Sequence, residues 1–581
     1  MRLVVQREIS NDKDLREAWR TLLQKVDQPQ VFYTYEWAAS VARAFTGSNP
    51  LLITAWDESE MVGVVALDAD YSKGQIAFLA GTTADYCDFI CVEKYRKEFI
   101  GKVLDHIEST GLKTLVLANL PADSPTSKLL RQVSRSRGFA VLVRPAYQCS
   151  QLRFNSPAER AVLKHAGSRK EAVRRHLKAL SKFGPVEIEH LSDTTKIEQE
   201  LRDFSQMHVS RFLTTGRISN LANPERRSFL REITQQLSAD GAVVLSRLSV
   251  LGRAIAWNFG FRFGNSWFWY QPTFDTEFQQ YSPGVCLLAK IIGDASQCTD
   301  LQLVDLGLGA EDYKDRWSNH GRETLHLTAS RSPVIHCRET LRYHVTRTLR
   351  RKPDIDRAVR IAVSAITRVK KKYKSFPALA RVARKRIASW LMGEPEVLFF
   401  ENSVPRPDPG AKIRVHPVTL KLLAQAVIDY ANDPETLSYL LRSAARLRTH
   451  KSQGFVAVDE VGVPVHFCWV TPFEDFYLEE LKRSLSAPSP DSKLIFDCWT
   501  PVSARGNGFY PATIAKVASD LAPGTRVWIF ASATSGASLH GIRKAGFIEG
   551  FSVRLRRSGL QKRAVYSDLA PGAMMRASSA A

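Results

Sequence analysis

Two short turns in the sequence combine residue types that can bind an anion at a helix start. The first is Ser282-Pro283-Gly284, which leads directly into an apolar helical stretch. Serine can cap a helix, proline suits the first helical position, and glycine leaves backbone N–H groups uncovered. Those donors could face solvent or an anion, so the turn predicts either a plain helix start or a phosphate-binding site.

The second turn is Arg505-Gly506-Asn507-Gly508, which lies between a strand pattern and a helical pattern. Two glycines one residue apart let the backbone approach a bulky anion, and successive N–H groups can form a concave nest. The helix dipole and Arg505 would add positive charge. The alternative is a tight strand-to-helix turn with a solvent-facing arginine.

A group of ionisable residues accompanies the predicted strand 301–307. Asp305 lies in that strand, and Glu311, Tyr313 and Lys314 lie at the start of the next predicted helix. A buried lysine can hold a phosphate or a developing oxyanion, and either carboxylate could accept the proton of an amine. The alternative is an ion pair that fixes the loop.

His208 and Arg211 are spaced three residues apart in a helical pattern, so they share one helix face. They could contact an acidic or sugar substrate. A surface or helix-capping role is the alternative.

Length and cysteine content narrow the class of protein. A chain of 581 residues is too long for one core and suggests three or four domains. Its eight cysteines include no C-x-x-C pair, so we expect reduced thiols and no metal site. No apolar signal region opens the sequence and no apolar run approaches the ~18 residues that span a bilayer, so we expect a cytoplasmic protein.

Positive charge is concentrated in one segment. The net charge is +22, and residues 331–390 contain 18 Lys or Arg against three acidic residues, which is +15. Apolar residues recur there at helical spacing, as at Leu341, Val345 and Leu349. These basic amphipathic helices could lie peripherally on an anionic membrane surface, bind an acidic partner, hold RNA, or form a solvated connector. No RNA-binding motif favours the RNA alternative.

Strand and helix patterns follow the same order in three parts of the chain. Each part reads as antiparallel strands, a helix, a strand, a helix and a strand, which predicts an α/β fold with mixed sheets. We expect units over 1–150, 151–330 and 395–581, and a basic helical connector over 331–394. In such units the ligand commonly lies at the end of the central strand, beside a helix start, where both turns fall.

The C-terminal part resembles the GNAT acyltransferases. R-G-x-G at 505–508 is followed by A-S-x-x-G-x-x-K-A-G-F at 537–547. The resemblance implies that 505–508, with Phe509 and Tyr510, lies at the pyrophosphate of acyl-CoA and that Ser538 belongs to the second cofactor-binding stretch. Ser535 stands where the family usually has asparagine, so one contact to the cofactor differs.

Several residues of the C-terminal part could transfer protons in such a reaction. Asp497, Glu479 and His540 are candidates for the base, although a histidine on a helix is more often a surface residue. Tyr510 could donate to a leaving thiolate or pack against the helix start. The sequence leaves these alternatives open.

Residues 1–330 resemble the CelD-like branch of the GNAT superfamily, which is related to the FemAB peptidyltransferases. The shared motifs are E-W at 36–37, D-Y-x-D at 85–88, a basic helix at 168–190, H-x-x-R at 208–211, the S-P-G start and D-x-G-x-G-x-E-x-Y-K at 305–314. The resemblance implies tandem GNAT-like units in which the first is largely degenerate and the second performs the chemistry. FemAB-like enzymes use a lysine at what looks like the position of Lys314.

These resemblances imply an acyl-CoA-dependent N-acyltransferase that uses acetyl-CoA or another acyl-CoA. The expected acceptor is a small-molecule amine, such as that of a sugar nucleotide or another envelope or exopolysaccharide precursor. One alternative is FemAB-like transfer from aminoacyl-tRNA, with 331–390 holding the RNA. Another is a non-catalytic acyl-CoA-binding scaffold that docks through 331–390 at the inner face of the membrane, on a polysaccharide synthase.

Overall fold

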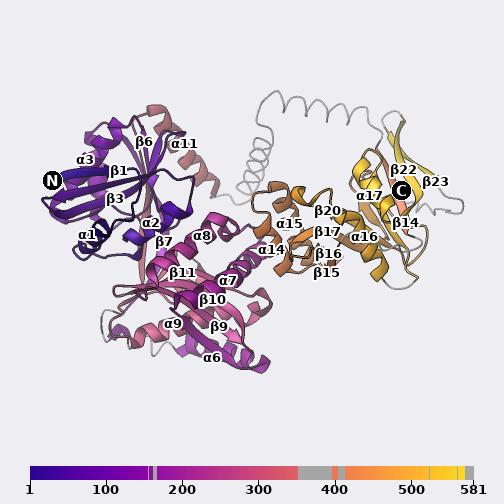
Figure 1. The fold of residues 1–581 in the computed structure, drawn as a ribbon, viewed down its shortest axis with the longest axis horizontal. Helices are drawn as coiled ribbons and strands as arrows, with labels where there is room; N and C mark the ends of the chain where they lie inside the picture. The colour runs from indigo at the N-terminus through magenta and orange to yellow at the C-terminus, as the bar shows by residue number, and fades with distance from the viewer. Residues whose placement is uncertain are drawn as a thin grey trace. The chain divides into compact units, whose positions relative to one another are not determined.

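The computed structural model divides the chain into two compact units. It describes residues 1–154, 156, 158–160, 167–309, 311–350, 395–402, 412–521, 524–558 and 561–568. Unit 1 comprises Met1–Arg211 and Asn223–Pro353, and unit 2 comprises Phe212–Ala222 and Asp354–Ala581. Figure 1 follows the chain from the N-terminus in indigo to the C-terminus in yellow. Most of the predicted basic connector lies outside the described residues.

The first half of unit 1 alternates strands with helices that have clear sequence signals. Asp12 caps the first helix by accepting from two backbone N–H groups, and the apolar residues of that helix recur on one buried face. In chain order the elements are β1 (Arg2–Gln6), α1 (Lys13–Leu23), α2 (Tyr35–Ala44), β2 (Pro50–Asp57), β3 (Glu60–Asp70), β4 (Gln75–Phe78), β5 (Ile90–Cys91), α3 (Glu93–Ser109), β6 (Thr114–Pro121), α4 (Pro125–Ser136) and β7 (Ala140–Arg153).

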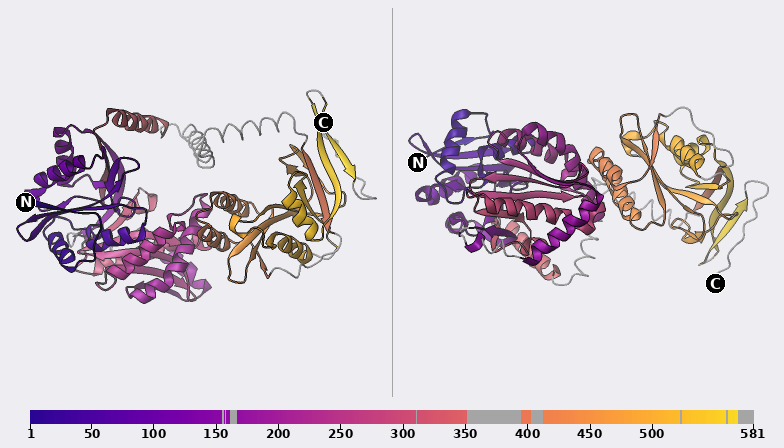
Figure 2. Two further views of the ribbon diagram at one scale, coloured as in Figure 1. Left: turned by 45° about the horizontal axis from the view of Figure 1, so that its top comes forward. Right: turned by 90° about the horizontal axis from the view of Figure 1, so that it is seen from below.

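The second half of unit 1 follows a similar order. Its elements are α6 (Gly167–Leu180), β8 (Val186–Leu191), α7 (Thr194–Thr214), α8 (Pro224–Leu237), β9 (Val243–Val250), β10 (Arg253–Phe263), β11 (Ser266–Phe274), α9 (Pro283–Gln297), β12 (Leu303–Leu308), α10 (Asp312–Asp315), β13 (His320–Ser330) and α11 (Pro333–Arg350). Helices α7 and α8 lie on one face of these strands, and α6 and α9 lie on the other (Figures 1 and 2). Leu287, Leu288 and Ile291 of α9 are fully buried against Trp267 of β11, and each such side chain contributes about 1.5–3 kcal/mol.

The strands of unit 1 form one continuous sheet in the order β1-β2-β3-β4-β6-β13-β7-β12-β11-β10-β9-β8. β13, the last strand of the second half, lies between β6 and β7 of the first half. β7 in turn pairs with β12 of the second half. Each half therefore completes the sheet of the other, and the boundary expected at residue 150 falls inside β7.

The unit 1 sheet splits where two neighbouring parallel strands stop pairing and diverge. This split, the fork, lies at the predicted site. β11 and β12 run parallel and pair only over Ser266–Phe268 with 303–305, after which they diverge. β11 continues to Phe274 and leads through a 3-10 turn at Thr276–Tyr281 into α9. A shorter fork lies between β4 and β6, which pair over 75–77 and 114–116. The fork directs the ends of β11 and β12 and the start of α9 toward one region.

Unit 2 contains a second mixed sheet, which also has a fork between two parallel strands. Its order is β15-β16-β17-β20-β21-β14-β22-β23, and β20 pairs in parallel with β21 over 493–495 and 527–529 only. Its elements are β14 (Glu396–Asn402), β15 (Arg414–Pro417), α14 (Leu420–Asp429), α15 (Pro434–Leu447), β16 (Gln453–Val458), β17 (Pro464–Pro472), β18 (Phe476–Leu478), β19 (Arg483–Leu485), β20 (Lys493–Trp499), α16 (Phe509–Asp520), β21 (Val527–Ser532), α17 (Gly536–Lys544), β22 (Ile548–Ser558) and β23 (Gln561–Asp568).

Three sequence expectations can be compared with general features of the fold. Among the described helices, none has the length and apolar character needed to cross a membrane. The described residues contain no group of three or more His, Cys, Asp or Glu side chains placed to hold a metal ion. In α11, the described part of the basic segment, Leu341 and Val345 are exposed, whereas the side chain of Leu349 lies outside the described residues.

Candidate functional site

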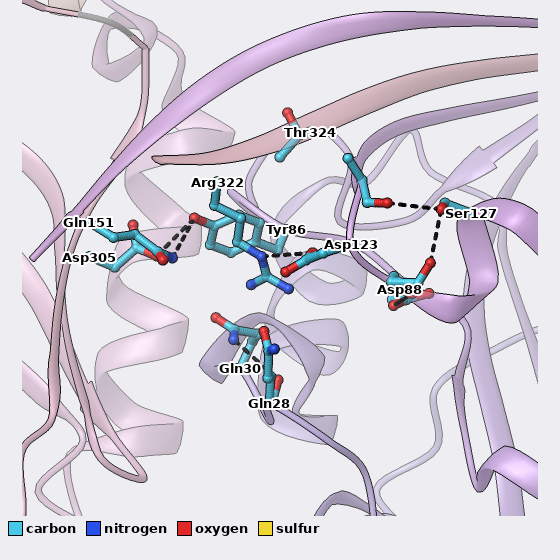
Figure 3. Close-up of polar contacts among 12 residues, drawn as sticks. Gln28, Gln30, Tyr86, Asp88, Asp123, Ser127, Gln151, Asp305, Arg322 and Thr324 are labelled. Carbon is cyan, nitrogen blue, oxygen red and sulfur yellow. Dashed lines mark hydrogen bonds and ion pairs between the residues drawn. The ribbon is translucent and has the colours of Figure 1, made fainter. Parts of the chain in front are cut away.

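Asp305 lies at the fork of unit 1, as the last β12 residue that pairs with β11. Its buried carboxylate accepts at Oδ1 from the Gly307 N–H at 2.8 Å. It accepts at Oδ2 from the Tyr86 hydroxyl at 2.8 Å and from the Gln151 amide at 2.7 Å (Figure 3). Two of these donors come from the first half of the unit. Because both oxygens are occupied, the contacts favour a positioning role for Asp305 over the predicted role of base.

Asp85 lies beside Asp305 and has the carboxyl group that is better placed for proton transfer. It accepts from the Leu308 N–H, and a Cβ added at Gly307 would lie 2.7 Å from its Oδ2. Glycine at 307 is therefore needed for this close approach. Desolvation and the Asp305 carboxylate raise the pKa of Asp85 to about 7, although nearby cations act in the opposite direction. Asp85 is partly buried as a residue, whereas Asp305 is 1% exposed.

Lys314 is buried at the start of α10, where its ammonium group contacts three oxygen atoms. It donates to the carbonyl of Leu308 at 2.9 Å and of Gly309 at 3.5 Å, and it lies 3.1 Å from the carboxylate of Glu311. The ion pair that would fix the loop is thus present, with the half-exposed Glu311 as the partner. These contacts bind Lys314 to the strand end and leave it no free donor for an oxyanion in this arrangement. α10 ends at Asp315, four residues earlier than the predicted helix 312–319.

Tyr313 joins α10 to β11 across the fork. Its hydroxyl accepts from the indole N–H of Trp269 at 3.2 Å, and burial raises the pKa of Tyr313. Burial keeps the hydroxyl protonated at neutral pH, so Tyr313 is a possible proton donor at the fork.

The predicted turn at Ser282-Pro283-Gly284 starts α9 but is less open than the sequence suggests. Ser282 has a left-handed backbone conformation and its side chain makes no capping hydrogen bond, which corrects the expectation that it caps the helix. Pro283 has no N–H, and the Val285 N–H bonds back to the Ser282 carbonyl. Gly284 is therefore the one residue of 283–285 whose N–H has no acceptor among the described residues.

Arg211 brings positive charge to the start of α9. Its guanidinium group donates to the Pro272 carbonyl at 3.1 Å and lies 4.5 Å over the ring of Phe274. The same ring would lie 3.4 Å from a Cβ added at Gly284. Arg211 and the Gly284 turn, predicted separately as substrate and cofactor contacts, are thus brought together around Phe274.

His208 is not placed to contact a substrate. It is 4% exposed, and burial together with Arg211 and Arg226 lowers its pKa to about 3. Its ring lies 6.1 Å from that of Phe204 inside the unit. His208 and Arg211 share one helix face, as the spacing predicts, but the His208 side chain is buried in the core.

A second polar cluster surrounds Arg322 of β13, on the side of Tyr86 away from Asp305 (Figure 3). The buried Arg322 guanidinium lies 4.7 Å from the Tyr86 ring and donates to Asp123 at 3.1 Å. Gln30 is buried nearby and donates to the carbonyl of Gln28, while its Oε1 has no partner among the described residues. A buried acceptor without a partner is costly, so it favours a bound polar group here. No sequence pattern predicts this cluster, because its members are far apart in the chain.

The Arg505–Gly508 turn of unit 2 has the open backbone that the sequence predicts. Gly506 and Gly508 have positive φ angles of 86° and 75°, and a Cβ at either would meet nothing within 4 Å. The N–H groups of residues 506–510, which include Phe509 and Tyr510, have no acceptor among the described residues. Arg505 donates to the Thr500 carbonyl at 3.1 Å and remains exposed beside the turn. The Asn507 amide donates to the Ala504 carbonyl at 3.3 Å, which stabilises the turn.

The candidate bases of unit 2 are not gathered at this turn. Asp497 accepts from Arg446 at 2.6 Å, Glu479 is exposed and paired with Lys482, and His540 is exposed on α17. Ser538 accepts from the Ser535 hydroxyl at 2.9 Å on the same helix.

His466 of β17 is a residue of unit 2 that the sequence reading missed. It is 1% exposed, its Nδ1 lies 2.8 Å from the Thr500 hydroxyl, and its ring lies 5.2 Å from that of Tyr510. Its Nε2 has no partner among the described residues, and burial lowers the pKa of His466 to about 3. Burial also raises the pKa of Tyr510. A histidine in an apolar strand was the only signal, and it also fits a plain core residue.

Comparison with known families covers the fork of unit 1. Residues 167–315 match the family model described as Acetyltransferase (GNAT) domain. This stretch includes the fork, α9, Asp305 and Lys314. The chain thus contains a stretch that matches a GNAT acetyltransferase domain. No match is found among curated proteins.

Three solved structures are similar to a little more than half of this chain. FemX is 12% identical, with a TM-score of 0.41, over 56% of this chain and 97% of FemX. The C-terminal domain of a putative lysylphosphatidylglycerol synthetase from Agrobacterium fabrum is 11% identical, with a TM-score of 0.38, over 58% of this chain and 97% of that chain. A tandem GNAT protein from the clavulanic acid biosynthesis pathway is 10% identical, with a TM-score of 0.35, over 57% of this chain and 99% of that protein's chain.

The two main forks of the chain differ in the side chains around them. Beyond the last β11–β12 pair, the unit 1 fork presents the carboxyl groups of Asp85 and Asp305 and the Tyr313 hydroxyl. Beyond the last β20–β21 pair, unit 2 has Phe496 and Phe530, both close to a third phenylalanine ring. Two neighbouring carboxyl groups thus lie at the fork of unit 1, whereas the open backbone donors lie at the Arg505–Gly508 turn of unit 2.

Proposed function

We propose that the chain transfers an acyl group to an amine at the fork between β11 and β12, with Asp85 as the base. The observation that carries this proposal is the pair of neighbouring carboxyl groups, Asp85 and Asp305. Asp305 is held by three donors, whereas Asp85 accepts from the Leu308 N–H and is only partly buried as a residue. A base works best when its pKa is near the working pH, and that of Asp85 is about 7.

The proposed chemistry uses side chains that already surround the fork. An ammonium acceptor gives one proton to Asp85, and its nitrogen then attacks the acyl carbonyl carbon. The new C–N bond forms as the bond from the acyl carbon to its carrier breaks. Tyr313, which stays protonated at neutral pH, could give its proton to the departing carrier, and its phenolate would then take the second proton that the nitrogen loses as the amide forms.

Acyl-CoA is the acyl donor that the residues of the chain fit best. It would supply the acyl group as a thioester, and its phosphates need backbone donors and cations. In unit 1 the Gly284 N–H and Arg211 could meet one phosphate group. In unit 2 the N–H groups of 506–510 and the nearby Arg505 could hold a pyrophosphate. Acetyl-CoA is the simplest donor of this class.

The Arg322 cluster supports a polar acceptor, such as an amino sugar carried on a nucleotide. Gln30 offers an unpaired buried oxygen for a hydroxyl or amine, and Arg322 could attract an anionic group. Tyr86 contacts both Arg322 and Asp305, so an acceptor held here would lie next to the fork. The proposal therefore favours an amine of a sugar nucleotide or a related envelope precursor.

Transfer from aminoacyl-tRNA is the second candidate, and one observation favours it. The S-P-G turn leaves a single free N–H among 283–285, which is few for a pyrophosphate but sufficient for a lone backbone phosphate. An aminoacyl ester would undergo the same attack by an amine at Asp85.

The full chain should release free thiol from acetyl-CoA when a suitable amine is present. The test offers acetyl-CoA with a panel of amines that includes amino-sugar nucleotides, and follows thiol release and the acylated product. The same panel is offered separately with a mixture of aminoacyl-tRNAs. Amine-dependent thiol release supports the proposal, and transfer only from aminoacyl-tRNA supports the second candidate. Binding of acetyl-CoA without transfer to any amine would contradict both and indicate a scaffold.

A further inference from the structure

A cavity of about 780 Å³ lies between α11 and one face of the unit 1 sheet, and none of its lining residues belongs to the fork. Its floor is formed by the neighbouring strands β4, β6, β13 and β7. Val116 is opposite Thr328, Thr328 is opposite Leu142, and His326 is opposite Arg144. Residues two apart in a strand point to the same face, so these side chains form one floor beneath α11.

The cavity is strongly positive. Among the described residues, one carboxylate, Glu339, lines it, against five cationic side chains: Lys73, Arg144, Arg338, Arg342 and Arg347. Within the described part of the chain, Arg144, Arg342 and Arg347 have no carboxylate partner, while the other two cations each contact one. The cavity therefore gathers at least three arginines whose charges are not neutralised by the protein.

The floor of the cavity is polar where a sheet face under a helix is usually apolar. Thr328 is buried, His326 is partly buried, and Arg144 is partly buried between the strands and α11. Burial and Arg144 lower the pKa of His326 to about 4, so at neutral pH His326 is uncharged and can exchange hydrogen bonds with a ligand. An apolar contact between α11 and the sheet would stabilise the helix better than this polar lining does. The polar lining therefore indicates that the cavity binds a polar ligand.

We propose that this cavity binds a small phosphorylated anion of nucleotide size that carries at least two phosphate groups. Arginine forms paired hydrogen bonds with phosphate, and several unneutralised arginines favour an anion with more than one charge. Sites for small molecules commonly have volumes of about 300–1,000 Å³, which includes this cavity. Val116, Leu142 and Tyr343 supply an apolar part of the lining for the rest of the ligand. The proposal does not rest on the acyl-transfer reaction.

A small anion fits the cavity better than a nucleic acid does. The cations lie on both sides of one cavity, on the sheet and on α11, rather than along a single stripe. Single-stranded nucleic acids bind in grooves that follow the backbone past several exposed aromatic rings. The one tyrosine in the lining, Tyr343, offers a single ring.

Isothermal titration of the full chain with ATP and with inorganic triphosphate tests the proposal. We expect both probes to bind the wild type. Replacement of two cations in Arg144→Gln/Arg342→Gln should weaken binding by roughly tenfold for each arginine lost. The matched control is Arg131→Gln/Arg135→Gln, which removes two exposed arginines of α4 outside the cavity and should leave binding unchanged. Acyl transfer should be the same in all three proteins.

A second variant tests the proposal even if the double variant does not fold. Arg342→Glu changes one exposed residue of α11, so it should fold normally, with an unchanged melting temperature, and still abolish binding of both probes. Equal affinity for ATP in the wild type and in the cavity variants would overturn the proposal. Binding of an RNA 20-mer that the cavity variants lose, with no binding of ATP or triphosphate, would also overturn it and assign the surface to nucleic acid.

Discussion

At the scale of single residues, the proposed reaction depends on the protonation of Asp85. The pKa of this carboxyl group is about 7, so the base is charged and active above pH 7 and increasingly protonated below it. We expect kcat/KM to rise as pH increases through 7 and then to level off. Asp85→Asn should lower kcat by about 10²–10⁴-fold, the usual contribution of a general base, and remove this rise. Initial rates of thiol release between pH 5.5 and 9 measure both effects.

A matched substitution separates this effect from a general change of charge. Asp203 is exposed on α7 in the same unit, and Asp203→Asn should retain the wild-type rate and pH profile. If Asp85→Asn kept the rise near pH 7, the titrating base would be another residue. Circular dichroism melting of both variants shows whether a lost rate reflects a lost fold.

Lys314 illustrates what residue type and spacing cannot decide. The sequence predicts a lysine at a helix start near carboxylates, which fits both an oxyanion-binding role and an ion pair. The carbonyls of Leu308 and Gly309 distinguish the two roles, because they use the remaining donors of the ammonium group. Every residue has a backbone carbonyl, so the sequence does not show which carbonyls Lys314 contacts. Only the folded loop shows them.

At the scale of elements, the sequence predicts strands well where they are apolar and poorly where they are not. The predicted strands 253–263 and 266–274 match β10 and β11 residue for residue, since both are rich in aromatic and branched side chains. The prediction for β7 stops at Pro145, whereas the strand continues to Arg153 through polar residues. A register shift opposite Pro145 accommodates the missing N–H. Gln151, which holds Asp305, lies in the part that was missed.

The two predicted anion-binding turns also diverge once folded. The sequence treats them alike, since each places glycine before an apolar helix. In the first, a preceding 3-10 turn and Pro283 use up most donors, and Ser282 does not cap. In the second, both glycines adopt positive φ and the donors of 506–510 stay open. What precedes a helix thus decides whether its start can bind an anion.

Gly508 should be essential for the open turn of unit 2. Its φ of 75° is strained for any residue with a branched side chain, so Gly508→Val should distort the turn even though a Cβ meets no neighbour. Hydrogen exchange read by mass spectrometry reports on the backbone of 506–512. Acetyl-CoA should slow exchange there in the wild type and have no effect in Gly508→Val. Gly508→Asn, which tolerates this backbone region, should retain most of the protection; equal protection in all three proteins would place the phosphates elsewhere.

At the scale of the whole molecule, strand exchange in unit 1 explains both the site and the limit of the sequence prediction. Repeated element order predicts separate units over 1–150 and 151–330. The sheet instead inserts β13 between β6 and β7, and β7 pairs with β12. This exchange brings Tyr86 of the first half onto Asp305 of the second, with Asp85 next to it. Pairing between distant strands leaves no mark in either strand's own pattern, so the sequence predicts Asp305 and Tyr313 as site residues but not Asp85 or the meeting of the two halves.

The exchanged strands predict that the two halves of unit 1 unfold together. Ile291 is fully buried in the second half, and Ile291→Ala should lower the free energy of unfolding by about 2–5 kcal/mol. Because β7 and β13 are shared, amides of β2 and β3 in the first half should lose as much hydrogen-exchange protection in mild denaturant as those of β9 and β10. Ile291→Val, which removes one methyl group, should produce a smaller loss of the same pattern. Loss of protection confined to residues 167–309 would mean that the halves unfold independently despite the shared sheet.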